Sequence, residues 1–226
     1  MGGKGGKINH PVIRHLLAPV SARAATSLHI PRTVAQPGVA LTFDDGPHPE
    51  GTPAVLGLLE RAGAKATFFM VGEQVDRRPQ LVAEVASRGH LVALHGYRHR
   101  LQVRMNPGET EADIARGLES LMRATESRPV LHRPPYGIYS PWGLRTVRGA
   151  GLRELLWSRW GKDWRGDATG ESIAALASAG VAPHDVILLH DADFYSSPGC
   201  HRQTARALQM ILGTLESREI ATVLPV

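Results

Sequence analysis

The sequence has only one cysteine in 226 residues, Cys200, and therefore cannot form an internal disulfide bond. It has no apolar run that approaches the roughly 20 residues needed for a transmembrane helix. It also has no dense basic tract, because its 26 Lys and Arg residues are scattered among 21 Asp and Glu residues, for a net charge of +5. These absences exclude a disulfide-stapled scaffold and a helical membrane protein. A dispersed positive charge is typical of a solvated surface, so we expect no nucleic-acid partner.

Length and composition indicate one globular domain preceded by a segment of different character. With 42% hydrophobic and 21% charged residues, the chain can bury one substantial core. The first 38 residues begin with Gly and Lys and contain only a short apolar stretch, interrupted by Pro19, which makes no clear signal peptide. We predict a flexible or loosely docked leader over residues 1–38 and a single folded domain over residues 39–226. The sequence itself shows neither export nor an oligomeric state.

Short apolar runs alternate with amphipathic segments along this domain. The runs predict seven strands, and the segments with apolar residues at helical spacing predict six helices. Strands are expected at residues 39–43, 66–70, 91–94, 130–132, 154–158, 186–189 and 220–224, and helices at 53–62, 79–88, 109–125, 141–150, 171–179 and 203–217. Such alternation is typical of a parallel sheet covered by helices, either a barrel or an open doubly wound sheet.

The placement of polar residues favours the barrel. Acidic, basic and imidazole side chains follow five of the seven predicted strands, at Asp44 and Asp45, His95 and His99, Arg133, Asp163, and His190. In a β/α barrel the carboxyl ends of all strands meet at one face, whereas an open sheet gathers only the loops beside its switch point. We therefore predict an α/β fold, a distorted and incomplete barrel with about seven parallel strands.

Two pairs of these residues have the chemistry of a metal site. His95 and His99 are four residues apart, so on a helical turn they would share one face. Asp44 and Asp45 are adjacent after a buried strand, where two carboxylates repel each other unless a cation is near. One carboxylate and two imidazoles can hold a divalent ion with open positions, and the second carboxylate is then available to move protons. This pattern predicts a metal-dependent hydrolase.

Five motifs in this order resemble those of the polysaccharide deacetylases, carbohydrate esterase family four, which share a homology domain with nodulation chitooligosaccharide deacetylases. The match extends from about Val39 to the C-terminus. Two positions depart from the family pattern: Gly96 replaces a Ser or Thr, and Trp160 replaces an Asp. The matching motifs are Thr42–Pro47 (TFDDGP), His95–His99 (HGYRH), Arg133–Gly137 (RPPYG), Asp163–Trp164 (DW) and Leu188–His190 (LLH).

The resemblance implies a set of roles for the motif residues. Asp45, His95 and His99 would hold the metal, and the family implies Zn²⁺, with Co²⁺ or another divalent ion as an alternative. Asp44 would be the general base that deprotonates water, and His190 the general acid that protonates the departing amine. The substrate implied is an N-acetylated glycan, and the family favours an extracellular or cell-wall location.

Further residues would support this chemistry. Arg133 would pair with Asp44 and orient its carboxylate, with Asp163 on the far side of the arginine. The backbone N–H of Tyr136 would stabilise the oxyanion, and Trp164 and Leu188 would line a recess for the acetyl methyl group.

The two departures and the competing functions leave alternatives open. Gly96 removes a hydroxyl that could support the histidine loop, and Trp160 could either stack on a sugar ring or fill the core. An O-acetyl esterase acting on acetylated xylan and a catalytically silent carbohydrate-binding relative are the alternatives within the fold. A non-haem iron oxygenase also uses two His and one carboxylate, but it would leave Asp44, Arg133 and His190 without a role.

Overall fold

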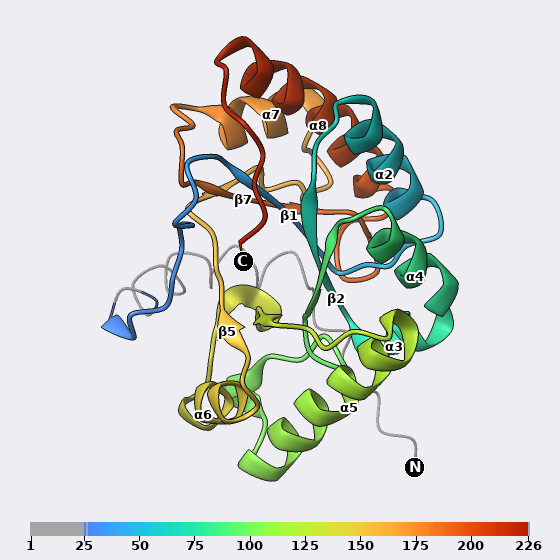
Figure 1. The fold of residues 1–226 in the computed structure, drawn as a ribbon, viewed down its shortest axis with the longest axis vertical. Helices are drawn as coiled ribbons and strands as arrows, with labels where there is room; N and C mark the ends of the chain where they lie inside the picture. Colours follow the sequence, from blue (N-terminus) through green and yellow to red (C-terminus); the bar gives the residue numbers. More distant parts are fainter. Residues whose placement is uncertain (1–24, 26, 226) are drawn as a thin grey trace.

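The computed structural model describes residue 25 and residues 27–225, which fold into one curled parallel sheet with helices outside it (Figure 1). The seven strands have the order β5-β4-β3-β2-β1-β7-β6, and every neighbouring pair is parallel. The strands are β1 (Ala40–Asp44), β2 (Ala66–Met70), β3 (Leu91–Leu94), β4 (Leu131–His132), β5 (Arg153–Glu154), β6 (Arg159–Trp160) and β7 (Val186–His190). The predicted distorted, incomplete barrel of about seven parallel strands is confirmed.

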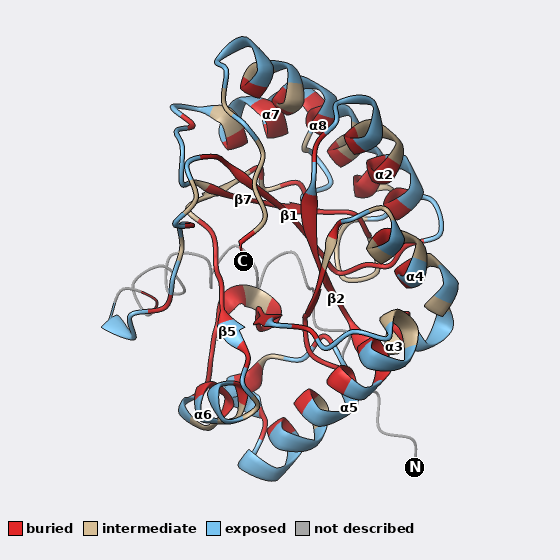
Figure 2. Cartoon of the chain, in the orientation of Figure 1, coloured by how far each residue is buried: buried red, intermediate tan, exposed pale blue. Residues whose placement is uncertain are grey.

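Seven α-helices surround the described part of the sheet and bury only their inner faces, whereas the central strands are buried throughout (Figure 2). All five residues of β1, β2 and β7 are buried. The helices are α2 (Gly51–Arg61), α3 (Gly72–Arg77), α4 (Pro79–Ser87), α5 (Pro107–Thr125), α6 (Pro141–Gly149), α7 (Gly170–Ser178) and α8 (Cys200–Ser217). None of the helices in the described ranges combines the length and apolar character needed to cross a bilayer.

Helix α5 shows how local sequence sets an element's start. Its N-cap is Asn106, whose side chain accepts a hydrogen bond from Glu109 N, while the Glu109 carboxylate accepts one from Asn106 N. Pro107 occupies the first turn, where its missing N–H costs nothing. The helix therefore begins two residues before the predicted position 109.

The predicted fifth strand, 154–158, is wrong and is replaced by two short strands at opposite edges of the sheet. β5 pairs with β4, and β6 pairs with β7. The connecting residues 155–158 therefore run from one edge of the curled sheet to the other. Their apolar side chains are buried because the segment closes the barrel (Leu155, Leu156 and Trp157 are at most 9% exposed) and not because it forms a strand.

The predicted last strand, 220–224, is also wrong, since it makes only one isolated bridge, between Thr222 and Val39. Ala221 is exposed and its neighbours are half-buried, so the apolar residues of this segment do not enter the sheet.

The N-terminal segment 1–38 lies largely outside the described residues. Its described part contacts the barrel at a few points: Ile30 and Val34 are buried, and Leu156 N donates to Pro31 O at 2.9 Å. The Arg32 guanidinium also donates to Trp157 O at 2.9 Å. These contacts brace the segment that closes the barrel. The domain boundary at residue 38 stays a prediction.

The buried imidazole of His132 makes the free energy of unfolding depend on pH. His132 is fully buried beside Tyr139, and burial lowers its pKa to about 3. The unfolded chain binds a proton at this histidine near pH 6.5 and the folded chain does not, so stability falls as the pH drops below that value. We expect this group alone to cost about 1.4 kcal/mol per pH unit between about pH 6 and pH 4.

The variant His132→Gln tests this expectation. Its free energy of unfolding in urea is measured with chelator present from about pH 7 to pH 4.5. It should fall less steeply with decreasing pH than that of the wild type, by about the 1.4 kcal/mol per pH unit that one proton contributes. Equal slopes for the two proteins would show that His132 becomes protonated in the folded state.

Candidate active site

The carboxyl ends of β1, β3, β4 and β7 bring the predicted site residues together. Asp44 ends β1 and lies in register with His190 at the end of β7. His95 follows β3 directly, and Arg133 follows β4, whose His132 pairs with Leu94. Residues nearly 150 positions apart in the chain thus face one pocket, as the barrel prediction requires.

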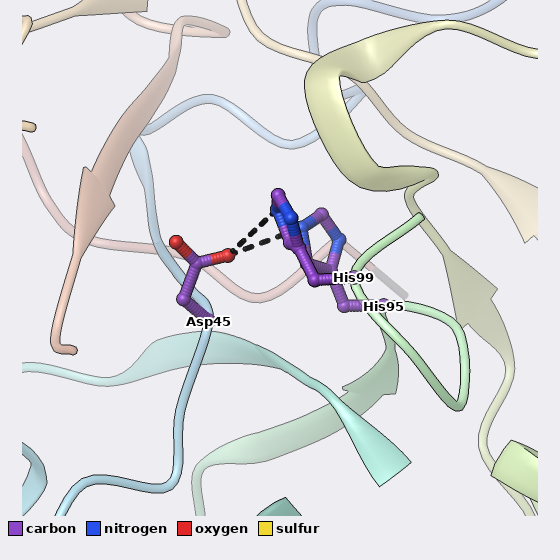
Figure 3. A group of neighbouring side chains, drawn as sticks. All are labelled: Asp45, His95 and His99. Carbon is purple, nitrogen blue, oxygen red and sulfur yellow. Dashed lines mark ion pairs between the residues drawn. The ribbon is translucent and has the colours of Figure 1, made fainter. Parts of the chain in front are cut away.

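Asp45, His95 and His99 form a buried cluster with the geometry of a metal site (Figure 3). The Oδ1 atom of Asp45 lies 3.2 Å from His99 Nε2 and 3.5 Å from His95 Nε2. Four ligands arranged tetrahedrally around Zn²⁺, at bonds of about 2.1 Å, lie about 3.4 Å apart. Both distances from Asp45 are close to this spacing.

The hydrogen bond of His95 leaves its Nε2 atom, which faces Asp45, as the nitrogen that could bind a metal. Its Nδ1 lies 2.8 Å from the carbonyl oxygen of Arg133, which can only accept, so Nδ1 carries the proton. Nε2 of the neutral ring then presents a lone pair toward Asp45. A neutral imidazole oriented in this way, together with a carboxylate, fits a divalent ion such as Zn²⁺ or Co²⁺.

His95 and His99 lie in a loop after β3, so the helical turn on which their spacing would place them on one face is not formed. Gly96 has φ of +80°, a left-handed conformation that breaks any helix at this point and that glycine adopts without strain. The two imidazoles still converge, since the loop folds back on itself. Asp45 also has a positive φ, +79°, which is strained for an aspartate and occurs here at the predicted metal ligand.

Arg133 is fully buried and holds the second carboxylate. Its Nη1 donates to Asp44 Oδ1 at 2.7 Å and to the Thr42 hydroxyl at 2.9 Å. Its Nε and Nη2 donate to the carbonyl oxygens of Leu155 and Leu156 at 2.9 and 3.0 Å. Burial lowers the pKa of Arg133, and the neighbouring Asp44 carboxylate opposes that shift. The predicted Arg133–Asp44 pair is therefore present, and it is anchored to the segment that closes the barrel.

Asp163 is not on the far side of Arg133, as the sequence suggested, but beside His190. Its Oδ1 accepts from His190 Nδ1 at 2.8 Å, and its Oδ2 accepts from His190 N at 2.7 Å and from the Thr204 hydroxyl at 2.8 Å. Four of the five N–H groups of Arg133 donate to other acceptors, none of them Asp163. The site therefore contains two separate pairs, Arg133–Asp44 and Asp163–His190.

A recess opens beside these pairs, lined by Asp44 and His190 among others. The predicted substrate-binding residues Tyr136, Trp164 and Leu188 all line it. Trp164 contacts His190 edge to face, with ring centroids 5.7 Å apart. Trp160 also lines the recess, in register with Leu188 on the neighbouring strand, so this departure from the family pattern places an indole at the site.

Sequence analysis missed several residues that support the site. Tyr195 stacks on the His99 ring, with centroids 4.3 Å apart, and its hydroxyl donates to Glu73 at 2.6 Å. Thr204 holds Asp163, and Trp157 lines the recess. Tyr195 and Thr204 lie outside the recognised motifs, and nothing in the spacing of the sequence relates them to the site.

A second group, His48, Asp193 and His201, also has donor atoms within 4.8 Å of one another. Its hydrogen bonds are inconsistent with a metal. His48 Nδ1 accepts from Gly51 N at 2.9 Å, so the neutral ring carries its proton on Nε2, which faces Asp193 Oδ1 at 3.3 Å. Burial lowers the pKa of His48, in keeping with the neutral form. The cluster is better described as an imidazole–carboxylate contact.

Fold and site together define a barrel hydrolase with a carboxylate and two imidazoles at the carboxyl ends of its strands, and comparisons with known proteins agree. The polysaccharide deacetylase family model matches residues 32–155. A peptidoglycan-N-acetylglucosamine deacetylase of Bacillus cereus is 37% identical over 80% of this chain and 82% of its own length. A chitooligosaccharide deacetylase of Sinorhizobium fredii is 34% identical over 84% of this chain and 91% of its own. The chain belongs to the polysaccharide deacetylase family.

Solved structures of the family share the fold. A family 4 acetyl xylan esterase from Clostridium thermocellum, in complex with a cobalt ion, has a TM-score of 0.75 and 32% identity, over 82% of this chain and 86% of that chain. The resemblance inferred from the five motifs is therefore confirmed, as is the prediction that the chain is an enzyme of this family.

Proposed function

We propose that the protein hydrolyses N-acetyl groups of an aminosugar polymer or oligosaccharide, of the chitooligosaccharide or peptidoglycan type, with a divalent metal. The observation that carries this proposal is the cluster of Asp45, His95 and His99 with Asp44 beside it, 3.8 Å from His95 Nε2 through Oδ2. The names of the B. cereus and S. fredii relatives support the substrate class.

A divalent ion at Asp45, His95 and His99 would supply Lewis acidity, which makes water nucleophilic near neutral pH. Asp44 takes the proton of the attacking water. Arg133 binds Asp44 Oδ1, so Oδ2 is the oxygen on the side of His95 that can accept this proton. The fixed guanidinium keeps the base in position, which matters because a shift of about 1 Å can cost roughly a hundredfold in rate.

His190 delivers a proton to the leaving amine. Its Nδ1 is bound to Asp163, which sets the ring orientation and stabilises the imidazolium, so the transferred proton comes from Nε2. The Tyr136 backbone N–H stabilises the developing oxyanion, and the positive φ of Tyr136, +63°, sets the direction of that peptide. Trp164 and Leu188 contact the acetyl methyl group in the recess.

Acetate release tests the proposal directly. The purified protein should liberate acetate from chitooligosaccharides or peptidoglycan, lose this activity with chelator, and regain it with Zn²⁺ or Co²⁺. Acetylated xylan is the matched comparison, since the C. thermocellum neighbour is named an acetyl xylan esterase. Hydrolysis of acetylated xylan alone would replace the proposal with the O-acetyl esterase, and full activity after exhaustive chelation would contradict the metal.

A further inference from the structure

The loop that carries the two histidines, residues 95–99, is held from outside by the side chain of Asp113 in α5. Asp113 Oδ2 accepts from Tyr97 N at 2.8 Å, and its Oδ1 accepts from Arg98 N at 3.1 Å. The carboxylate thus binds two consecutive backbone N–H groups between His95 and His99. No other side chain of the described residues makes a hydrogen bond to these two groups.

The carbonyl groups of the same loop are also bound. Gly72 N donates to Gly96 O and Glu73 N donates to Tyr97 O, both at 2.9 Å, from the start of α3. Helix α5 approaches closely as well, since a Cβ on Gly117 would lie 3.1 Å from Tyr97 N. The centre of the loop is therefore clamped between α3 and α5, and Asp113 is the only charged group in the clamp that bonds to loop N–H groups in the described structure.

The Asp113 carboxylate lies where a side chain at position 96 would be. A Cβ on Gly96 would lie 3.0 Å from Asp113 Oδ2 and 3.2 Å from Arg98 O, and the φ of +80° strains any other residue. Residue 96, where the family pattern has Ser or Thr, thus contributes no side chain of its own here. The Asp113 carboxylate fills this place and supplies the hydrogen bonds that hold the loop.

We propose that Asp113 is a positioning residue that fixes the 95–99 loop so that both imidazoles meet Asp45. The inference rests on the proposed metal function. The tolerance is small, because His95 and His99 must both place Nε2 within about 3.5 Å of one carboxylate oxygen to share a tetrahedral ion. Groups that orient metal ligands from behind typically contribute 10- to 100-fold to metal affinity, and removing them frees the ligands to move.

The test is the Zn²⁺ dissociation constant, measured by competition with a chromophoric chelator, for the wild type, Asp113→Ala, Asp113→Asn and Glu111→Gln. Glu111 is an exposed acid of the same helix and serves as the matched control. We expect Asp113→Ala to weaken Zn²⁺ binding about 10- to 100-fold. Asp113→Asn keeps one acceptor oxygen and should lie between Asp113→Ala and the wild type, and Glu111→Gln should match the wild type.

A second readout separates positioning from general stability. The kcat at saturating Zn²⁺ should be reduced much less than the affinity, because the bound ion restores the loop. If Asp113→Ala does not fold by circular dichroism, Asp113→Asn decides. Unchanged Zn²⁺ affinity in a folded Asp113 variant would overturn the inference, whereas a wild type that binds no Zn²⁺ would instead overturn the proposed function.

Discussion

Asp44→Asn is expected to abolish acetate release while leaving Zn²⁺ bound. The amide retains the shape of the carboxylate and can still accept from Arg133 Nη1, but it cannot take a proton from water. Loss of a general base typically costs 10²- to 10⁴-fold in rate, so we expect kcat to fall by about that much. The measurement is kcat on an acetylated chitooligosaccharide together with Zn²⁺ content per chain.

The neighbouring variant Asp45→Asn is the matched control, because it changes the same charge one residue away. It should lose Zn²⁺ affinity, since Asp45 is the carboxylate within 3.5 Å of both imidazoles. Asp44→Asn should therefore be inactive with Zn²⁺ bound, whereas Asp45→Asn should be inactive because it does not bind Zn²⁺. Normal turnover by Asp44→Asn, or normal Zn²⁺ affinity in Asp45→Asn, would reverse the assignment of the two carboxylates.

Arg133→Met should both destabilise the protein and inactivate it. Arg133 is fully buried, and its removal leaves the Asp44 carboxylate and the carbonyl oxygens of Leu155 and Leu156 without their donor. Breaking a buried ion pair from one side costs about 3–5 kcal/mol. The free energy of unfolding in urea should fall by about that amount, and kcat by about a hundredfold or more because the base is no longer held.

Arg133→Lys distinguishes charge from geometry. A lysine restores the positive charge but cannot reach both Asp44 and the two carbonyl groups, because it lacks the planar fork of the guanidinium. We expect it to recover part of the stability and little of the activity. Arg165→Met, at an exposed arginine paired with exposed Asp167, should change stability by less than about 0.5 kcal/mol. Wild-type activity in Arg133→Lys would mean that the charge alone suffices.

Sequence patterns predicted most of the barrel because its strands and helices have strong local signals. Ala66–Met70 and Leu91–Leu94 were predicted at their observed bounds, since each is a short, mainly apolar run that follows a polar residue, Lys65 or His90. The predicted strand 154–158 was wrong because an apolar run indicates burial but not which backbone groups form hydrogen bonds. Whether Leu155 pairs in a sheet or crosses a gap depends on tertiary contacts that no local pattern records.

The site was predictable to the extent that its residues lie in the recognised motifs. The proximity of Asp45, His95 and His99, the Arg133–Asp44 pair and the lining of the recess by Trp164 and Leu188 were expected and are present. The partner of Asp163 was not, because spacing in sequence does not reveal whether Arg133 or His190 lies beside it. Asp113 escaped notice for a different reason: on an exposed helix its charge is indistinguishable from that of any solvated acid.

The pairing of β1 with β7 has a consequence for synthesis of the chain. The Thr42 hydroxyl donates to Ile187 O across 145 residues of sequence, so the strand that ends at Asp44 gains its second neighbour only after residues 186–190 have been synthesised. Until then one edge of β1 offers unpaired backbone groups to any other extended chain. Nascent chains stalled before residue 186 should therefore be the species that chaperones bind and that aggregates in crowded expression.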